Sequence, residues 1–436
     1  MKKNYSLSTI FLSLVLYISS FTAFAQATFT NGVFALNEGG FGLNNASVSF
    51  IKEDGTLQNN IFATVNPTQG SLGDTAQSIA INGDFLYVVN NGSEDIKVIN
   101  STTFQYVTTI TNSVAYPRYI AFYDGKAYVT NWGAGGPNDH YVAVYNLTDN
   151  TLVTTIPTGS GIERILEING KLYVAHQGGY GYGNTISIID PVTNTVTGTI
   201  NVADVPNSMV EKDGFLYVLC GGKPSWVELP LVETFGALLK INIATNTVVS
   251  QIDFPNMHPS NLKIDGNDMY YTVDSHIFKS TVTTSTLPTV PLIDLEPQGA
   301  YGIYGMDVID DKIYVGDALG YITDGKTYVY TTSGTLLNTY TVGFLPNAFI
   351  KSKETPLSTG DFTKTAVSIY PNPANDVFFL TTDKNAKVNL YDLSGRLVKT
   401  QNYTAKGVDI SSLNAGIYLA EITIDETKEV QKIIIK

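Results

Sequence analysis

Cysteine and charge are scarce in this sequence. Only 15% of its 436 residues are charged, and acidic residues outnumber basic ones by 39 to 26, which gives a formal net charge of −13. A surface of that sign repels phosphate backbones, so we expect no nucleic-acid partner. Cys220 is the only cysteine, so no internal disulfide can form. We expect it to be a buried small residue rather than a reactive thiol.

Long apolar runs are missing after the first residues. No later run reaches the roughly 18 residues that a membrane-spanning helix needs, so we expect no transmembrane segment in the mature protein. The start resembles a secretory signal, with Lys2 and Lys3, an apolar centre at 10–18 and Ala-Phe-Ala at 23–25. The sequence therefore predicts a signal peptide over residues 1–25 and an exported protein. Since Cys220 lies far from this signal, a lipid anchor on an N-terminal cysteine is excluded.

Catalytic motifs are missing as well. The sequence has no Gly-x-Ser-x-Gly elbow, no paired His-x-x-x-His and no phosphate loop. The glycine-rich run at 178–183 lies between two predicted antiparallel strands and not before a helix, which excludes a dinucleotide site. We therefore expect no enzymatic activity.

Tyrosine and glycine are abundant, with 27 and 38 copies, which favours β-sheet with many turns. A short phrase recurs, in which a turn pair is soon followed by Tyr and usually Val. Its tyrosines are separated by 41 to 53 residues, the period of a four-stranded propeller blade. These tyrosines, which we expect to pack inside the blades, are Tyr87, Tyr128, Tyr173, Tyr217, Tyr270 and Tyr314.

A seventh copy opens the repeat region. The stretch GVFALNEGGFGLNNASVSFI from Gly32 aligns with KLYVAHQGGYGYGNTISIID, and Phe34 takes the place of Tyr173. This copy lacks the strand that precedes the phrase elsewhere, but a matching segment, PNAFIKS, occurs at 346–352. We predict that this segment supplies the innermost strand of the first blade and removes the open sheet edges. The fold class is thus all-β, a seven-bladed β-propeller over residues 26–352.

The longer connections of these blades should lie on one face. Strand direction alternates, so the second-to-third-strand loops and the links between blades share one rim, and the short Asn-Gly and Asp-Gly turns share the other. Binding sites concentrate on loops held by a rigid scaffold, and these loops carry aromatic and amide groups. The candidate ligand-binding residues are Asn37, Glu38, Phe41, Arg118, Asn131, Trp132, His140, Tyr141, Arg164, His176, Gln177, Tyr180, Tyr182, Trp226, Asp274, His276, Tyr304 and Tyr321.

The C-terminal residues form a separate module. After a linker at 353–365, residues 366–436 contain alternating strands that predict a small β-sandwich. Tyr370-Pro371-Asn372-Pro373, the run LYDLSGRLV at 390–398 and Gly416-Ile417-Tyr418-Leu419 resemble the type A C-terminal sorting domain of the type IX secretion system of Bacteroidetes. That resemblance implies handling by the type IX machinery and export across both membranes, followed by display on the cell surface or release.

The repeats also resemble known propellers. Tyr128-Val129-Thr130-Asn131 is similar to the YVTN phrase of YncE-like propellers, and LNEGGFGLNNASVSFI at 36–51 resembles the first blade of Bacteroidetes surface propellers that capture cobalamin. The resemblance implies binding of cobalamin or another corrinoid, as a ligand rather than a catalytic cofactor, beside a TonB-dependent outer-membrane transporter. Those proteins carry a lipid anchor, which we do not expect in this protein.

Other interpretations stay open. The protein could bind another protein or a glycan, or be a metal-dependent propeller hydrolase that recruits groups such as Glu38, Asn90, Asn207 and Asp274. The three candidate histidines could converge on a metal or ligate cobalt. No accompanying ligand spacing supports this, so we assign no metal site. Arg118, with its neighbours Glu163 and Arg164 near the axis, could form a charge pair or anchor an anion.

Overall fold

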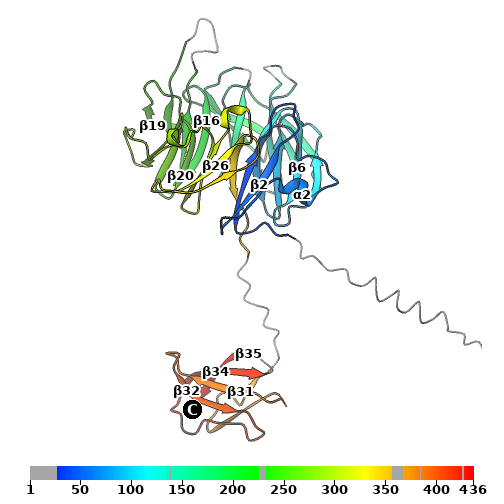
Figure 1. Cartoon of the computed structure of the whole chain (residues 1–436), viewed down its shortest axis with the longest axis vertical. Helices are drawn as coiled ribbons and strands as arrows, with labels where there is room; N and C mark the ends of the chain where they lie inside the picture. Colours follow the sequence, from blue (N-terminus) through cyan, green and yellow to red (C-terminus); the bar gives the residue numbers. More distant parts are fainter. Residues whose placement is uncertain are drawn as a thin grey trace, which may run out of the picture. The chain divides into compact units, whose positions relative to one another are not determined.

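The computed structural model describes residues 27–134, 136, 139–179, 181–224, 232–355, 367–382, 384–424 and 427–436 (Figure 1). The predicted signal peptide and most of the predicted linker lie outside these residues. Contacts divide the chain into two units, Met1–Glu354 and Thr355–Lys436. Among the described residues, none of the helices is long and apolar enough to span a membrane.

The described part of the first unit contains seven four-stranded antiparallel sheets, numbered here in chain order. Their strands, in pairing order, are β28(Pro346–Lys351), β1(Gly32–Asn37), β2(Ser47–Lys52), β3(Leu57–Gln58) in sheet 1; β4(Ala76–Asn82), β5(Phe85–Asn90), β6(Asp95–Asn100), β7(Tyr106–Ile110) in sheet 2; β8(Pro117–Tyr123), β9(Lys126–Asn131), β10(Tyr141–Asn146), β11(Leu152–Pro157) in sheet 3; β12(Ile162–Ile168), β13(Lys171–His176), β14(Thr185–Asp190), β15(Thr195–Asn201) in sheet 4; β16(Pro206–Lys212), β17(Phe215–Cys220), β18(Ala237–Asn242), β19(Thr247–Asp253) in sheet 5; β20(Ser260–Asp265), β21(Asp268–Val273), β22(His276–Thr281), β23(Ile293–Asp294) in sheet 6; and β24(Ile303–Ile309), β25(Lys312–Asp317), β26(Lys326–Thr331), β27(Leu336–Thr341) in sheet 7. The connections also include α2(Ile61–Val65), η1(Glu296–Gln298) and η2(Leu319–Tyr321).

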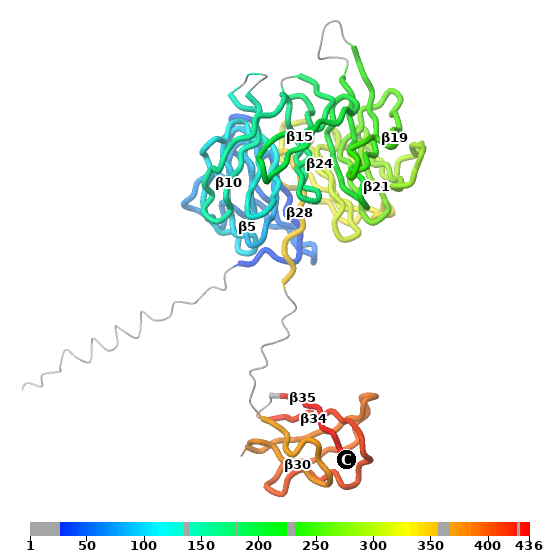
Figure 2. Tube along the Cα trace, turned by 180° about the vertical axis from the view of Figure 1, so that it is seen from behind, coloured from blue at the N-terminus to red at the C-terminus, as the bar shows by residue number. Residues whose placement is uncertain are grey.

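The sheets form a closed, propeller-like ring. Each sheet places one strand innermost, and β28, β4, β8, β12, β16, β20 and β24 contact one another in that order, with β24 returning to β28. The strand predicted to close the ring does so, because β28 pairs with β1 and aligns Val33 with Lys351. Figure 2 shows the N-terminal and C-terminal segments of this unit side by side, in blue and yellow-orange.

The repeated tyrosines are packing residues, as predicted. Each is at most 6% exposed. For three of them the hydroxyl group reaches the outer turn of the next sheet: Tyr128 Oη donates to the Pro191 carbonyl at 3.4 Å, Tyr173 Oη donates to Asn246 Oδ1 at 2.9 Å, and Tyr217 Oη donates to the Val282 carbonyl at 3.2 Å. A buried Tyr usually finds such a partner, and these bonds favour Tyr over Phe at the three positions. Cys220 is also fully buried, as expected, and burial raises the pKa of its thiol to about 12.

The longer loops and the links between sheets meet on one face, as the strand directions require. The first backbone N–H of a loop donates to the last carbonyl of the link, for example Trp132 to Tyr116 at 3.2 Å and Gly221 to Val205 at 2.8 Å. The link residues that accept these bonds have positive φ, with 46° at Tyr116 and 62° at Val205. Because side chains avoid this left-handed region, the recurrence marks a strained joint built into the repeat.

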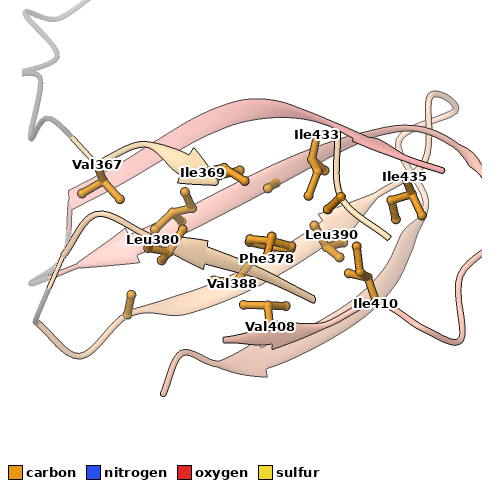
Figure 3. Close-up of a cluster of buried hydrophobic side chains, with 14 of the residues drawn as sticks. Val367, Ile369, Phe378, Leu380, Val388, Leu390, Val408, Ile410, Ile433 and Ile435 are labelled. Atoms are coloured by element: carbon orange, nitrogen blue, oxygen red, sulfur yellow. The ribbon is translucent and has the colours of Figure 1, made fainter. Parts of the chain in front are cut away.

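The second unit has two sheets around one core (Figure 3). One sheet contains β29(Ile369–Tyr370), β30(Val377–Leu380) and β33(Val408–Asp409). The other contains β32(Leu397–Asn402), β31(Lys387–Tyr391), β34(Gly416–Ile424) and β35(Thr427–Ile435). Phe378, Leu390 and Ile433 come from different strands and are fully buried in this core, so the unit has a hydrophobic interior of its own.

Candidate functional site

The loop face contains a pocket of about 450 Å³ over sheets 3 and 4. It brings together four residues predicted from the sequence, which come from strand β8 and from the β9–β10 and β13–β14 loops: Arg118, Trp132, Gln177 and Tyr182. The rest of its lining consists of Glu163, Gly179, Gly181 and Val205. The volume lies in the range of about 300–1,000 Å³ that is usual for small-molecule sites.

A buried ion pair with a bifurcated hydrogen bond forms one wall of this pocket. Arg118 Nε donates to Glu163 Oε1 at 3.1 Å and to Oε2 at 2.9 Å, and the two side chains are only 15% and 5% exposed. Burial opposes the charge of Arg118, but the Glu163 carboxylate outweighs this and raises the arginine's pKa. Of the two alternatives for Arg118, the geometry favours the charge pair. This wall therefore presents no net charge, and the pocket suits a ligand that is not strongly anionic.

The indole of Trp132 is fixed beside this pair. The Arg118 guanidinium stacks over the Trp132 ring at 4.2 Å from its centroid, and Trp132 Nε1 donates to the Ile162 carbonyl at 2.9 Å. A ring held on two sides loses little freedom when a ligand packs against it. Trp132 thus offers a pre-organised apolar surface, while Gln177 and Tyr182 supply polar groups.

Close backbone approaches explain the glycine-rich loop at 178–183. A Cβ on Gly183 would lie 2.0 Å from the His176 carbonyl oxygen. Gly179 has φ +63°, and a Cβ there would lie 3.1 Å from His140 Cε1 and 3.5 Å from Trp132 Cε2. Glycine therefore lets this loop pack tightly against the indole.

Two candidate histidines hold loops rather than face a ligand. His176 is 4% exposed, and its ring nitrogens lie 2.8 Å from the Ser160 carbonyl and 2.8 Å from Ser187 Oγ. His140 is 1% exposed, and its Nδ1 accepts the Gly161 N–H at 3.1 Å. Burial lowers the pKa of both rings. The proposed convergence of three histidines is not observed, because no group of three or more His, Cys, Asp or Glu side chains that could hold a metal occurs among the described residues.

Two further candidates are wrong as ligand contacts in this conformation. Asn37 and Asn131 are fully buried. Asn37 Nδ2 donates to two serine hydroxyls, and Asn131 Oδ1 accepts the Ala115 N–H at 3.0 Å. Both occupy the last position of the second strand of a sheet, as His176 does. The side chain at this position hydrogen-bonds to a neighbouring strand or to the link that precedes the sheet. Tyr141 is also engaged, since its Oη donates to the Ser113 carbonyl at 3.1 Å.

A second polar cluster lies near the centre of the ring. Tyr304 Oη donates to Glu38 Oε2 at 2.6 Å, and Asn347 Nδ2 donates to the same oxygen at 3.3 Å. Burial raises the pKa of Glu38, against the effects of these bonds and of the nearby Arg118 charge. Arg164 donates from Nε to the Asn207 carbonyl at 3.2 Å and stacks over Tyr119 at 4.1 Å. Glu38, one of the groups named for a hydrolase, is therefore held by hydrogen bonds within the fold.

The remaining candidates lie away from the pocket or outside the described residues. Phe41 is 78% exposed and Tyr321 52% exposed, on sheets 1 and 7. Asp274 is exposed, and His276 Nε2 lies 3.6 Å from Asp294 Oδ1 in sheet 6. Tyr180 and Trp226 fall outside the described residues. Glu163 and Val205 line the pocket but were not among the candidates. The sequence indicated Glu163 only through its expected place near the axis, beside Arg118.

Two family models match this chain. Residues 368–436 match the secretion system C-terminal sorting domain. Residues 31–342 match a domain of unknown function (DUF5074), which covers more than half of the chain. The chain belongs to the DUF5074 family. Its sorting domain marks the protein for export by the type IX secretion system to the cell surface or the extracellular space.

Solved structures support the fold of this DUF5074 protein. A quinoprotein alcohol dehydrogenase-like protein from Bacteroides thetaiotaomicron is 16% identical, with a TM-score of 0.55 over 74% of this chain and 79% of that one. A functionally unknown protein from Desulfotomaculum acetoxidans is 16% identical, with a TM-score of 0.51 over 75% of this chain and 100% of that one. At this identity the likeness shows a propeller-like fold alone. No curated protein matches this DUF5074 chain.

Proposed function

We propose that this exported protein is a YncE-like, seven-bladed Bacteroidetes propeller with a β-sandwich tail, and that its loop face binds a bulky organic ligand of the corrinoid class, such as cobalamin, for outer-membrane uptake. The pocket formed by Arg118, Trp132, Gln177 and Tyr182 is the observation that carries the proposal. It combines a fixed indole with a neutralised charge pair and nearby amide and phenol groups. Such a lining suits a large, partly apolar molecule edged with amides.

The buried histidines define how a corrinoid would be held. His140 and His176 are each engaged within the fold and are at most 4% exposed. Ligation of cobalt by either ring would require these contacts to break. In this proposal the ligand is therefore held by packing on Trp132 and by hydrogen bonds to its periphery. The expectation that the protein is not an enzyme stays a prediction.

Transfer to a TonB-dependent transporter would need a protein-binding surface on the same face. Exposed apolar side chains gather in the connections of the neighbouring sheets 1 and 7, and include Phe41, Leu43, Tyr301, Tyr321 and Ile322, from 52% to 81% exposed. Apolar groups exposed together are typical of interaction sites. This supports a protein partner for the loop face and makes sheets 1 and 7 the place to test for it.

Calorimetric titration of the full chain with cyanocobalamin tests the proposal. We expect saturable binding at micromolar concentration, weakened by Gln177→Ala and by Tyr182→Ala, which remove pocket groups. Asn256→Gly is the matched control, because Asn256 is exposed in the link between sheets 5 and 6 and has a φ of 57° that glycine accepts. No heat and no retention of cyanocobalamin at micromolar concentration would reject the corrinoid proposal.

A further inference from the structure

A second pocket, of about 400 Å³, lies between the connections of sheets 1 and 7. It shares no lining residue with the pocket of Trp132. Its walls come from the β1–β2 loop, the β3–β4 link with α2, the end of the β25–β26 loop and the β27–β28 link. The lining consists of Asn44, Asn45, Ala46, Ser47, Asn59, Asn60, Ala63, Ser71, Leu72, Asp324, Val342, Gly343 and Phe344.

The chemistry of this lining is polar without positive charge. It contains four asparagines, two serines and one carboxylate, and neither Lys nor Arg is among the lining residues. Asparagine amides both donate and accept hydrogen bonds, and a carboxylate accepts them. Phe344 adds one partly buried aromatic ring. A neutral molecule with many hydroxyl groups and apolar C–H faces satisfies such walls, whereas a phosphate or another anion would meet Asp324 without a compensating cation.

The loops that carry these amides are held in place by the fold. Ser71 Oγ donates to Asn44 Oδ1 at 2.8 Å, Gly40 N–H donates to Asn45 Oδ1 at 2.8 Å, and Asn59 Nδ2 donates to the Thr341 carbonyl at 3.0 Å. The last of these bonds joins the β3–α2 segment to the end of β27. The walls are therefore pre-organised, which reduces the ordering cost of binding.

Several groups of the lining keep hydrogen-bonding capacity for a ligand. Within the described protein, the Asn44 and Asn45 Nδ2 atoms, the Asn60 amide and the Asp324 carboxylate make no hydrogen bond. Asn60 precedes α2 with φ 49° and does not cap it with its side chain. An asparagine in this place usually caps the helix, so its amide is left available to the pocket.

We propose that this pocket binds a neutral saccharide, with Asn44, Asn45, Asn60 and Asp324 bonded to sugar hydroxyls and Phe344 packed against a sugar ring. The proposal is independent of corrinoid binding, because the two pockets have separate walls. For an exported protein, such a site provides a contact with polysaccharide at the cell surface.

Titration of the full chain with maltopentaose, cellopentaose, xylopentaose and chitopentaose, each by calorimetry, is the test. We expect at least one of these neutral oligosaccharides to bind with a Kd of roughly 1 mM or tighter. Asn60→Gly and Asp324→Ala should each weaken that binding at least about fivefold, as expected for the loss of a hydrogen bond to the ligand. Asn60→Gly removes an amide at a positive φ that glycine accepts, so the backbone is preserved.

The controls separate this site from the pocket of Trp132. Asn256→Gly makes the same chemical change at a similar φ of 57° and should leave sugar binding unchanged. Gln177→Ala should also leave it unchanged while it weakens the binding of cyanocobalamin. Absence of binding to all four oligosaccharides overturns the proposal, and so does binding that Asn60→Gly and Asp324→Ala leave intact in variants with a normal unfolding midpoint.

Discussion

Replacing Glu163 by Gln removes the charge that Arg118 faces at the pocket wall while keeping the shape of the side chain. Loss of one partner from a buried pair usually costs about 3–5 kcal/mol, because the other charge stays buried without compensation. The Arg118 side chain is 15% exposed to solvent, and the negative charge of Glu38 also stabilises its positive charge. We therefore expect Glu163→Gln to lower the free energy of unfolding by about 2–3 kcal/mol, below the full penalty.

Tryptophan fluorescence during urea unfolding measures this loss in the propeller alone. Both tryptophans of the sequence, Trp132 and Trp226, precede residue 355, so the sorting domain contributes no signal. Trp132 is also in contact with Arg118 and reports on the pair directly. The free energy follows from the midpoint and the slope of the transition.

A double variant distinguishes the pair from its surroundings. If the two residues act together, Arg118→Met combined with Glu163→Gln should cost less than the sum of the single changes, by about 1 kcal/mol or more. As a control, Asp310→Asn breaks an exposed pair with Lys351 and should leave the midpoint unchanged. Strict additivity, or a loss below about 0.5 kcal/mol in Glu163→Gln, would refute the assignment of a coupled buried pair.

Two further predictions concern the loop and the histidines that support the pocket. Gly183→Ala should destabilise the propeller by about 3 kcal/mol or more, since the added Cβ would lie 2.0 Å from a backbone oxygen. Gly181→Ala in the same loop should be nearly neutral, because nothing lies within 4 Å of its Cβ. Equal urea midpoints for the two variants would contradict this packing. Burial lowers the pKa of His176 below its ordinary 6.5, so the unfolded chain binds a proton that the folded chain does not, and stability should be lost as pH falls below 6.5. His176→Gln should lose that part of the pH dependence when unfolding is compared at about pH 7.5 and 5.5, and an unchanged dependence would show that His176 is not its source.

The repeat made the ring predictable from the sequence. The period of the tyrosine phrase predicts four strands per unit, and the missing strand before Phe34 predicts the pairing that β28 makes with β1. The same reasoning places the long loops on one face, because strand direction alone decides it. These features depend on chain connectivity and periodic burial, both of which the sequence expresses directly.

The site residues were less predictable, because the sequence marks a polar residue near a loop but not its burial. Asn37, Asn131 and His176 end the second strand of three sheets, and all three are at most 4% exposed. When the repeats are aligned, Asn90 and Asp317 fall at the same position, and both are also buried. A polar side chain that recurs at the same repeat position indicates a joint of the scaffold. The indole of Trp132 does not recur in this way, and Trp132 lines the pocket together with Gln177 and Tyr182.

Ring closure by β28 also bears on how the protein is made. Val33 pairs with Lys351, so the first sheet can be completed only after nearly the whole repeat region has been synthesised. The sorting domain follows at residues 368–436. A polypeptide whose translation stops before Pro346 lacks both its closing strand and its export tag, so an unfinished propeller with open edges is not addressed to the secretion machinery.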